Sequence, residues 1–421
     1  MITGKERVQT VLSHHEADGI ALDFGATPVT GIHVKKIAEF RQYYGLEDKP
    51  VKVIEPFQML GEVDDELADI WKVDTIGVSG SSDMFGHVQE DFVETRMPWG
   101  QMVLLSKSFN TKEKNGNTYV FPQGDTSCSP TAVMPAGGYF FDAIERGLPT
   151  EMDAELNIED NLEEFTLMTN TDLLYWKEAL SKARTTGRAV VANIGGTGFG
   201  DIALVPGLNL KNPKGIRAIT DWYMSTVMRE DFIREIFDRQ SDIALKNLEK
   251  VNQLAGDCID VLYVCGTDLG TQDSQFCSAE TLSSLYGHAY RKINDWVHNN
   301  TGWKTFKHCC GSIVPLLDTF IDCGFDIINP VQINAAGMDP KFLKKTYGDK
   351  VCFWGGGIDT QRVLQTGTPQ EVKNQVRQLC EIFGAGGGFV FNTVHNLQAN
   401  VPAENAFALM DAICELRIIN Q

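Results

Sequence analysis

The residues best suited to chemistry in this chain are a histidine and two cysteines in direct succession, His308, Cys309 and Cys310. In an extended segment residues i and i+2 point to the same side, so His308 and Cys310 can face one point while Cys309 faces away. An imidazole nitrogen and a thiolate suit zinc, and a third ligand would leave one tetrahedral position open, as in catalytic zinc sites. His395 is the candidate third ligand, because it follows a later strand-like run. The simpler alternative is that both cysteines are buried thiols and His308 is a hydrogen-bonded core residue.

Asp268 lies in a loop flanked by glycines and has several candidate roles. It could be a general acid, a hydrogen-bond partner of a metal-bound histidine, or an acceptor for substrate. A turn residue that caps the next helix is the simpler alternative, and the same alternative applies to Asp359, which follows three glycines. We expect Asp268 and His395 to be the catalytic residues.

These side chains need a scaffold, and the apolar pattern predicts one. Short β-branched runs alternate with longer amphipathic segments, which is typical of repeated βα units around a parallel sheet. The predicted strands are residues 19–24, 73–78, 189–194, 260–265, 304–308, 325–329, 350–354 and 388–392. The predicted helices are residues 173–185, 231–252, 279–299, 313–323, 340–347 and 369–383.

Polar or glycine-rich segments directly follow the predicted strands. The carboxyl ends of barrel strands are where active sites are built, because the following loops converge there. We therefore expect substrate-binding residues among these polar side chains, namely Gln272, Asn329, Gln332, Asp359 and Asn396.

Eight parallel strands with intervening helices predict an α/β fold, a (β/α)₈ barrel. We expect residues 1–421 to form one domain with a cap-like insertion at about 80–150. Within the insertion, residues 98–122 predict a β-hairpin that runs from the apolar stretch after Trp99, through an Asn115-Gly116 turn, to the strand that begins at Thr118.

The charge and cysteine content of the chain indicate which kinds of binding partner and which compartment to expect. The chain has 421 residues with 37 Lys and Arg against 56 Asp and Glu, a net charge of −19. Such an excess of negative charge would repel nucleic acid and anionic membranes, so neither is an expected partner. Ten cysteines in this length suggest reduced thiols rather than a disulfide scaffold. With no apolar leader or membrane-spanning run, we expect a cytoplasmic protein.

Several motifs occur together in the C-terminal half. They are Asp268-Leu-Gly-Thr-Gln272, His308-Cys-Cys-Gly311, Gly324-Phe-Asp-Ile-Ile-Asn-Pro-Val-Gln332, Gly356-Gly-Ile-Asp359 and Val394-His-Asn-Leu-Gln398. In this order they resemble the uroporphyrinogen decarboxylase superfamily, particularly its corrinoid-dependent methyltransferase branch. Near the other end, Asp23-Phe-Gly-Ala-Thr27 resembles the opening of the longer methyltransferases.

The resemblance implies a (β/α)₈ barrel and a choice between two activities. The methyltransferase branch implies zinc on His308 and Cys310, and a methyl group moved to the cobalt(I) corrinoid of a partner protein. Thiol-methylating members have a cysteine as third ligand where this chain has His395, which argues against a thiol acceptor.

The resemblance also implies a methoxylated aromatic compound as the small-molecule donor, with the run Tyr139-Phe140-Phe141 as a pocket wall. Zinc would polarise the ether oxygen, and Asp268 or His395 would protonate it. The alternative is a metal-free decarboxylase of a carboxylated tetrapyrrole, although the N-terminal segment lacks the arginines that such enzymes carry. A third hypothesis is a non-catalytic barrel that binds a tetrapyrrole or corrinoid. A homodimer is a separate expectation.

Overall fold

The predicted strands form one eight-stranded parallel sheet in the computed structural model, which describes residues 2–147 and 155–419. The strand order is β1-β17-β16-β15-β14-β13-β12-β5. Each strand overlaps a predicted segment, because an all-apolar run buried on both faces is a strong signal for a parallel strand. The bounds are β1 Ala21–Leu22, β5 Thr75–Ser79, β12 Ala189–Asn193, β13 Ile259–Cys265, β14 Lys304–His308, β15 Ile327–Asn329, β16 Cys352–Trp354 and β17 Phe389–Phe391.

The two ends of this sheet meet beside Asp74. Its backbone N–H donates to the carbonyl of Leu22 at 2.9 Å, and its carboxylate accepts the N–H of Leu22 at 2.8 Å. Arg7 and Arg417 both form buried ion pairs with Asp74, at 2.6 and 2.8 Å. The sheet therefore curves into a barrel, and the predicted (β/α)₈ fold is confirmed. Apolar side chains fill its interior, among them Val191, Val261, Phe306, Ile327, Trp354 and Val390.

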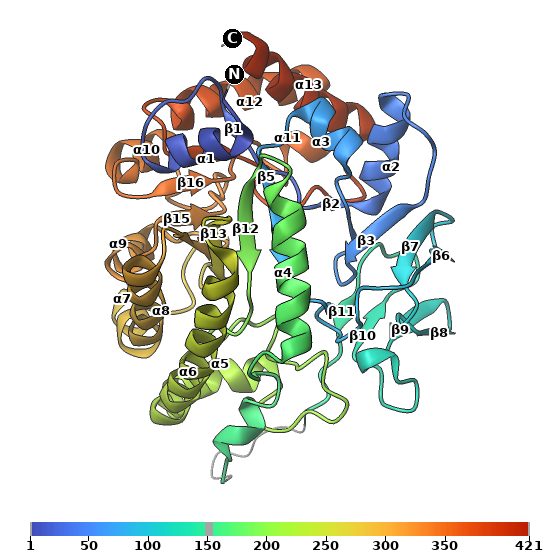
Figure 1. Cartoon of the computed structure of the whole chain (residues 1–421), viewed down its shortest axis with the longest axis vertical. Helices are drawn as coiled ribbons and strands as arrows, with labels where there is room; N and C mark the ends of the chain where they lie inside the picture. Colours follow the sequence, from blue (N-terminus) through green and yellow to red (C-terminus); the bar gives the residue numbers. More distant parts are fainter. Residues whose placement is uncertain (1, 148–154, 420–421) are drawn as a thin grey trace.

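Helices surround the barrel, and Figure 1 shows α4 and α6 running beside its strands. All the predicted helices are present, since each has an apolar face that packs on the sheet. They correspond to α4 Asn170–Arg184, α6 Glu230–Ala255, α7 Ala279–Thr281 with the π-helical turn Leu282–Tyr286 and α8 Gly287–Asn300, α9 Val314–Asp322, α10 Pro340–Tyr347 and α12 Pro369–Gly384. The further helices are α1 Gly4–Leu12, α2 Val34–Tyr43, α3 Asp65–Trp71, α5 Ile219–Met228, α11 Val363–Thr366 and α13 Ala403–Ile419.

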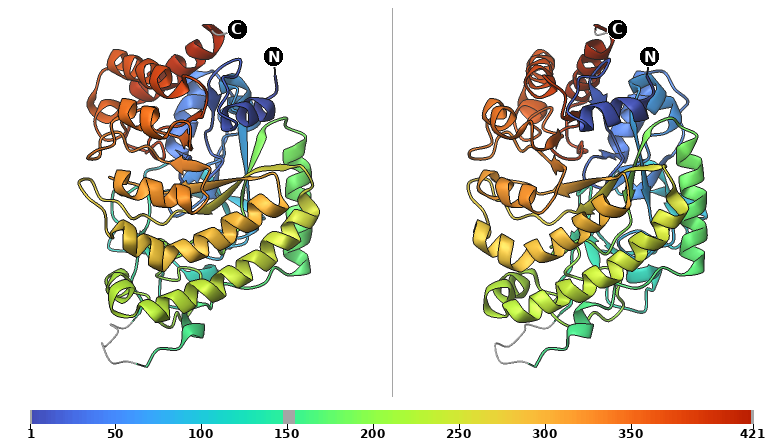
Figure 2. Two further views of the ribbon diagram at one scale, coloured as in Figure 1. Left: turned by 90° about the vertical axis from the view of Figure 1, so that its left-hand side faces the viewer. Right: turned by 60° about the vertical axis from the view of Figure 1, so that its left-hand side comes forward.

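The amino end of the barrel is closed by α1. Val8, Val11 and Leu12 of this helix belong to the same buried cluster as the barrel interior. Figure 2 shows α1 near both chain ends, with the long helices α6 and α8 stacked side by side. The opposite, carboxyl end of the strands is the open end.

Two small sheets occupy the first half of the chain, to the right in Figure 1. One has the order β2-β4-β3-β7-β6 and the other β11-β10-β9-β8. Their strands are β2 Ile32–His33, β3 Val51–Glu55, β4 Leu60–Gly61, β6 Phe92–Arg96, β7 Met102–Ser106, β8 Thr111–Lys114, β9 Asn117–Val120, β10 Ala132–Met134 and β11 Asp142–Ala143. The division of residues 1–421 into one domain with an insertion at about 80–150 stays a prediction, and residues 148–150 of that range lie outside the described part.

The predicted hairpin is present, with one correction. Lys114 pairs with Asn117 across the turn, and Asn115 and Gly116 both have positive φ, 54° and 79°, as a two-residue hairpin turn requires. The strand that pairs with β9 is β8, however, and not the apolar stretch after Trp99. That stretch forms β7 and pairs with β6 instead, because its apolar side chains are needed in the core beneath the five-stranded sheet.

Among the described residues, no helix is long and apolar enough to cross a membrane.

Candidate metal centre

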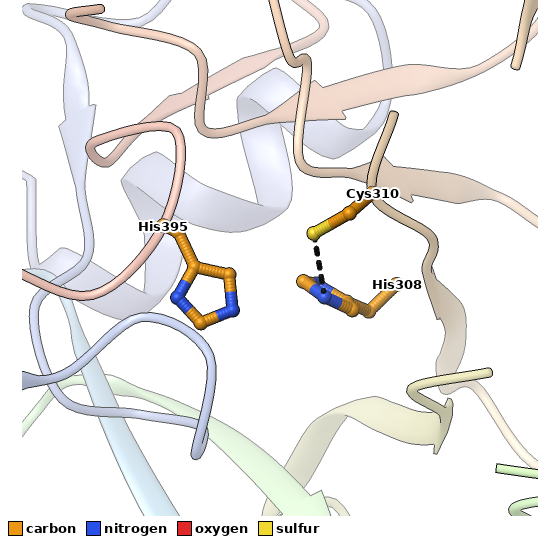
Figure 3. Close-up of side chains that lie close together, drawn as sticks. All are labelled: His308, Cys310 and His395. Atoms are coloured by element: carbon orange, nitrogen blue, oxygen red, sulfur yellow. Dashed lines mark hydrogen bonds between the residues drawn. The ribbon is translucent and has the colours of Figure 1, made fainter. Parts of the chain in front are cut away.

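His308, Cys310 and His395 come together at the open end of the barrel. Their ligand atoms all lie within 4.8 Å of one another, and Nε2 of His308 lies 3.3 Å from Sγ of Cys310. His395 belongs to the loop after β17, and Figure 3 shows its ring opposite the other two side chains. Cys309 faces away, since its sulfur accepts the backbone N–H of Leu269 at 3.2 Å. The alternation expected of an extended segment is therefore present.

A buried amide fixes the ring of His308. Nδ2 of Asn329 donates to the carbonyl of Trp354 at 2.7 Å, so its Oδ1 is the acceptor for Nδ1 of His308 at 2.6 Å. Nδ1 must then carry the proton, which leaves the lone pair of Nε2 free on the side of Cys310. Hydrogen bonding of the second ring nitrogen is how proteins orient metal-binding histidines.

Two glycines let the loops after β13 and β14 pack directly on each other. A Cβ on Gly311 would come 2.5 Å from the carbonyl carbon of Gly270, and one on Gly270 would come 2.4 Å from the carbonyl oxygen of Cys310. Gly311 also has φ +94°, a conformation that favours glycine. Close packing of these backbones brings Asp268 to Cys310, whose N–H donates to Oδ1 of Asp268 at 2.6 Å.

Asp268 lies beside both His308 and Cys310, and its catalytic role stays a prediction. Its Oδ1 lies 3.6 Å from Nε2 of His308 while it accepts the N–H of Cys310. The carboxylate orders the loop that carries Cys310 and adds negative charge beside the cluster. Its side chain also borders the cavity described below.

The electrostatic environment keeps both histidines neutral. Burial lowers the pKa of His308, although Asp268 opposes the shift. Burial also lowers the pKa of His395 to about 4, and His308 adds to this shift. Burial raises the pKa of the Cys310 thiol well above its usual value, with a further contribution from Asp268. The thiol would ionise only with a cation beside it.

The donor set fits zinc. At usual bond lengths and a tetrahedral angle, a histidine nitrogen and a cysteine sulfur on one zinc lie about 3.6 Å apart. The separation of 3.3 Å between Nε2 of His308 and Sγ of Cys310 is close to this value. His395 would supply the third ligand, and a fourth position would face the cavity. The assignment of these residues as zinc ligands stays a prediction.

A large cavity of about 1850 Å³ opens beside the cluster. His308, His395 and Asp268 line its inner end. Tyr139 and Phe140 line it from the segment between β10 and β11, as predicted for the pocket wall. Further aromatic side chains, Phe24, Phe57, Phe141 and Tyr263, line the same space. The cavity therefore has aromatic as well as charged side chains in its lining.

The predicted substrate-binding residues are placed differently. None of them is among the described residues that line the cavity. Asn329 sits behind His308, and Gln332 accepts the N–H of Gly311 at 2.7 Å while donating to Gln272 at 3.1 Å. These contacts hold the loops that carry the cluster.

Asp359 and Asn396 also have structural contacts. Asp359 accepts the N–H groups of Gln361 and Arg362, which is the turn geometry named as the simpler alternative. Asn396 accepts the N–H of Gly31 at 2.6 Å and donates to the carbonyl of Pro28 at 2.8 Å. Polar residues that follow a strand do lie at the carboxyl end of the barrel. Their position in the sequence does not show which side chains point into the cavity and which hold loops together.

Asp201 and Tyr263 are among the polar cavity residues that the sequence analysis missed. Tyr263 lies within β13, where it was taken as part of an apolar run, and its hydroxyl is directed towards Asp201 and Asp268. Asp201 ends the glycine-rich loop after β12, several residues beyond the strand. The same rule of polar residues after strands would have found it if extended to the whole loop.

Comparison with known proteins agrees with this architecture, a (β/α)₈ barrel with polar loops gathered at one end. Residues 214–416 match the profile of the family described as uroporphyrinogen decarboxylase (URO-D). The match covers just under half of the chain and confirms the resemblance to this superfamily seen in the motifs.

Individual relatives match over short stretches. The uroporphyrinogen decarboxylase of Pseudoalteromonas translucida is 36% identical over 72 residues, 17% of this chain and 20% of that protein. That of Aliivibrio salmonicida is 36% identical over 95 residues, 20% of this chain and 26% of that protein. The matches thus span about a fifth to a quarter of these relatives.

A solved structure described as a methyltransferase from Methanosarcina mazei has the same fold. It superposes with a TM-score of 0.53 and 13% sequence identity, and covers 99% of both chains. At this identity the likeness concerns the fold.

Proposed function

We propose that this chain is a methyltransferase that takes a methyl group from a methoxylated aromatic compound and transfers it to the cobalt(I) corrinoid of a partner protein. The observation that carries the proposal is the convergence of His308, Cys310 and His395 beside a large cavity at the open end of the barrel. The similarity in fold to a structure described as a methyltransferase supports the same class.

Breaking a methyl ether is difficult because the leaving alkoxide or phenoxide is strongly basic. Zinc, when bound, supplies a Lewis acid for the ether oxygen. The residues of the chain position the ligands of the metal. Asn329 holds His308 in the tautomer that exposes Nε2, and Asp268 holds the loop that carries Cys310. The open position of the cluster would then be directed into the cavity.

The aromatic wall suits an aromatic donor. Tyr139 and Phe140, between β10 and β11, line the same cavity as His308, so a flat ring could pack on them with its methoxy group towards His308. Packing of this kind would hold the methyl carbon for attack from the mouth, where the corrinoid protein must approach. Positioning of the reactants supplies a large part of such a barrier.

The charges of the cavity disfavour the decarboxylase alternative. Among the described lining residues, the lysines and arginines are Lys52, Lys182 and Arg188. Each is already ion-paired, with Glu62 at 3.2 Å, Glu178 at 2.8 Å and Asp69 at 2.9 Å respectively. Asp201, Asp268 and Glu55 also face this space. A substrate with several carboxylates would meet repulsion there.

The test is methyl transfer from a panel of methoxyarenes to cob(I)alamin, with zinc measured in the same preparation. We expect about one zinc per chain, lost together with activity in Cys310→Ser. Cys309→Ser is the matched control, because Cys309 faces Leu269 instead of the cluster, and it should keep its zinc. Failure of zinc-loaded protein to demethylate any donor would refute the proposal, and full zinc occupancy in Cys310→Ser would remove Cys310 from the ligand set.

The partner protein, a homodimer and a cytoplasmic location stay predictions. Co-purification with a corrinoid protein would test the first of these, and light scattering the second.

A further inference from the structure

Asp201 is a half-buried carboxyl group of the inner cavity that the sequence motifs did not single out. It follows the loop after β12, and its Oδ1 accepts the N–H of Ala203 at 3.0 Å. A Cβ placed on Gly266 would come 3.0 Å from Oδ2 of Asp201 and 2.5 Å from the hydroxyl of Tyr263. The absence of a side chain at Gly266 therefore lets this carboxyl and this phenol lie side by side at the end of β13.

The surroundings of Asp201 differ from those of Asp268. Burial raises the pKa of Asp201 to about 6, and the negative charge of Asp268 adds to the shift. Lys307 on β14 and the N–H groups of Ala203 and Gly266 oppose it. The phenols of Tyr263 on β13 and Tyr223 on α5 also lie near both carboxylates, which raise the pKa of each phenol. Asp201 can thus hold a proton near neutral pH.

Asp268 is engaged elsewhere. Its Oδ1 accepts the N–H of Cys310 and lies 3.6 Å from Nε2 of His308. If His308 and His395 bind a cation, their free nitrogens are no longer available for proton transfer. When two carboxyl groups in one active site have different environments, one commonly stays ionised while the other carries the proton.

We propose that Asp201 is the general acid that protonates the leaving oxygen of the methyl donor. This inference rests on the proposed function and replaces Asp268 and His395 in that role. The CH₃–O bond breaks with its electron pair left on oxygen, and the methyl carbon accepts the electron pair of cobalt(I) in the corrinoid acceptor. The carboxyl proton of Asp201 passes to that oxygen. The products are the free phenol, the methylated corrinoid and the Asp201 carboxylate, which regains a proton from water at the mouth.

The main test compares wild type with Asp201→Asn on donors whose leaving groups differ in basicity. For an unactivated methoxyarene we expect kcat to fall about 10²- to 10⁴-fold in the variant, the usual contribution of a general acid. For 4-nitroanisole the loss should be much smaller, since nitrophenoxide leaves without a proton. Asp318→Asn, an exposed carboxylate on α9 outside the cavity, is the control and should behave as wild type on both donors.

The pH profile gives a second prediction. A general acid must be protonated, so kcat/KM of wild type should fall as pH rises through about 6, and Asp201→Asn should lose this dependence. Equal losses on both donors together with an unchanged profile would overturn the role of Asp201 and leave methyl transfer intact.

Readouts other than activity separate this inference from the proposed function. The infrared carbonyl band of a protonated carboxylic acid should grow as pH falls through about 6 and be diminished in Asp201→Asn. Zinc content of the variant should equal that of wild type, and its loss would instead make Asp201 a residue that supports the metal loops. If wild type demethylates no donor, the proton-transfer role fails with the proposed function, whatever the infrared band shows.

Discussion

Replacing Asn329 with alanine should loosen metal binding through His308 without touching a ligand. The substitution removes the acceptor of His308 Nδ1 at 2.6 Å and the donor to the carbonyl of Trp354 at 2.7 Å. Both partners are buried, and each buried polar group left without a hydrogen bond costs about 1–3 kcal/mol. We therefore expect the free energy of unfolding to fall by about 2–6 kcal/mol.

The zinc affinity should fall by about 10- to 100-fold, because the ring of His308 would no longer be held in the tautomer that exposes Nε2. Competition with a chromophoric chelator measures the affinity, and denaturant unfolding measures the stability. Asn329→Asp keeps the acceptor and loses only the donor, so its zinc affinity should stay near that of wild type.

Asn161→Ala is the matched control. Asn161 is also a buried amide with hydrogen bonds at both ends, to the N–H and the carbonyl of Ile216, but it lies outside the cluster and has no contact with His308. It should lose a similar stability and keep its zinc affinity. The reasoning is refuted if the two alanine variants weaken zinc equally, or if Asn329→Ala leaves the affinity unchanged.

Three further predictions concern the loops, the cap and the barrel interior. Gly311→Ala should lower the free energy of unfolding by about 2–6 kcal/mol and lower the zinc content, because Gly311 has a positive φ and its new Cβ would clash with the backbone of Gly270. Gly302→Ala, which has open space around it, should change neither the thermal unfolding nor the zinc content. Burial lowers the pKa of His33 to about 4 from 6.5, so its charged form favours the unfolded chain. The free energy of unfolding should therefore decrease by about 3 kcal/mol as the pH falls from about 6.5 to 4. In His33→Gln the free energy of unfolding should depend less on pH over this range. Trp354→Phe should cost about 1–3 kcal/mol in urea unfolding, since it removes the bond from Nε1 to Asp23 at 2.8 Å, and an unchanged midpoint would contradict that reasoning.

Much of the scaffold was predictable because its signals are local. The run 261–265 has no charged residue, and strands buried on both faces are typically apolar in this way. The pair His308 and Cys310 follows from the two-residue period of a strand, which depends only on the backbone. The Asn115-Gly116 turn is equally local, since few residues accept positive φ at both positions.

Contacts between distant segments could not be read in this way. The apolar strand β7 pairs with β3 and β6 and not with β9, because its buried side chains belong to the core beneath the five-stranded sheet. The predicted substrate-binding side chains are hydrogen-bonded to other parts of the protein, as Asn329 is to His308, Gln332 to Gly311 and Asn396 to Gly31.

The alternation of apolar strands with amphipathic helices was sufficient to predict a barrel, and the spacing of His308 and Cys310 was sufficient to predict that their side chains share one side. Only the packing of the loops after β12 and β13 placed Asp201 beside Tyr263, where Gly266 leaves room for both. The reason is physical: the pattern of residues along a strand fixes its faces, whereas the proton affinity of a carboxyl group depends on burial and on charges contributed by distant parts of the chain.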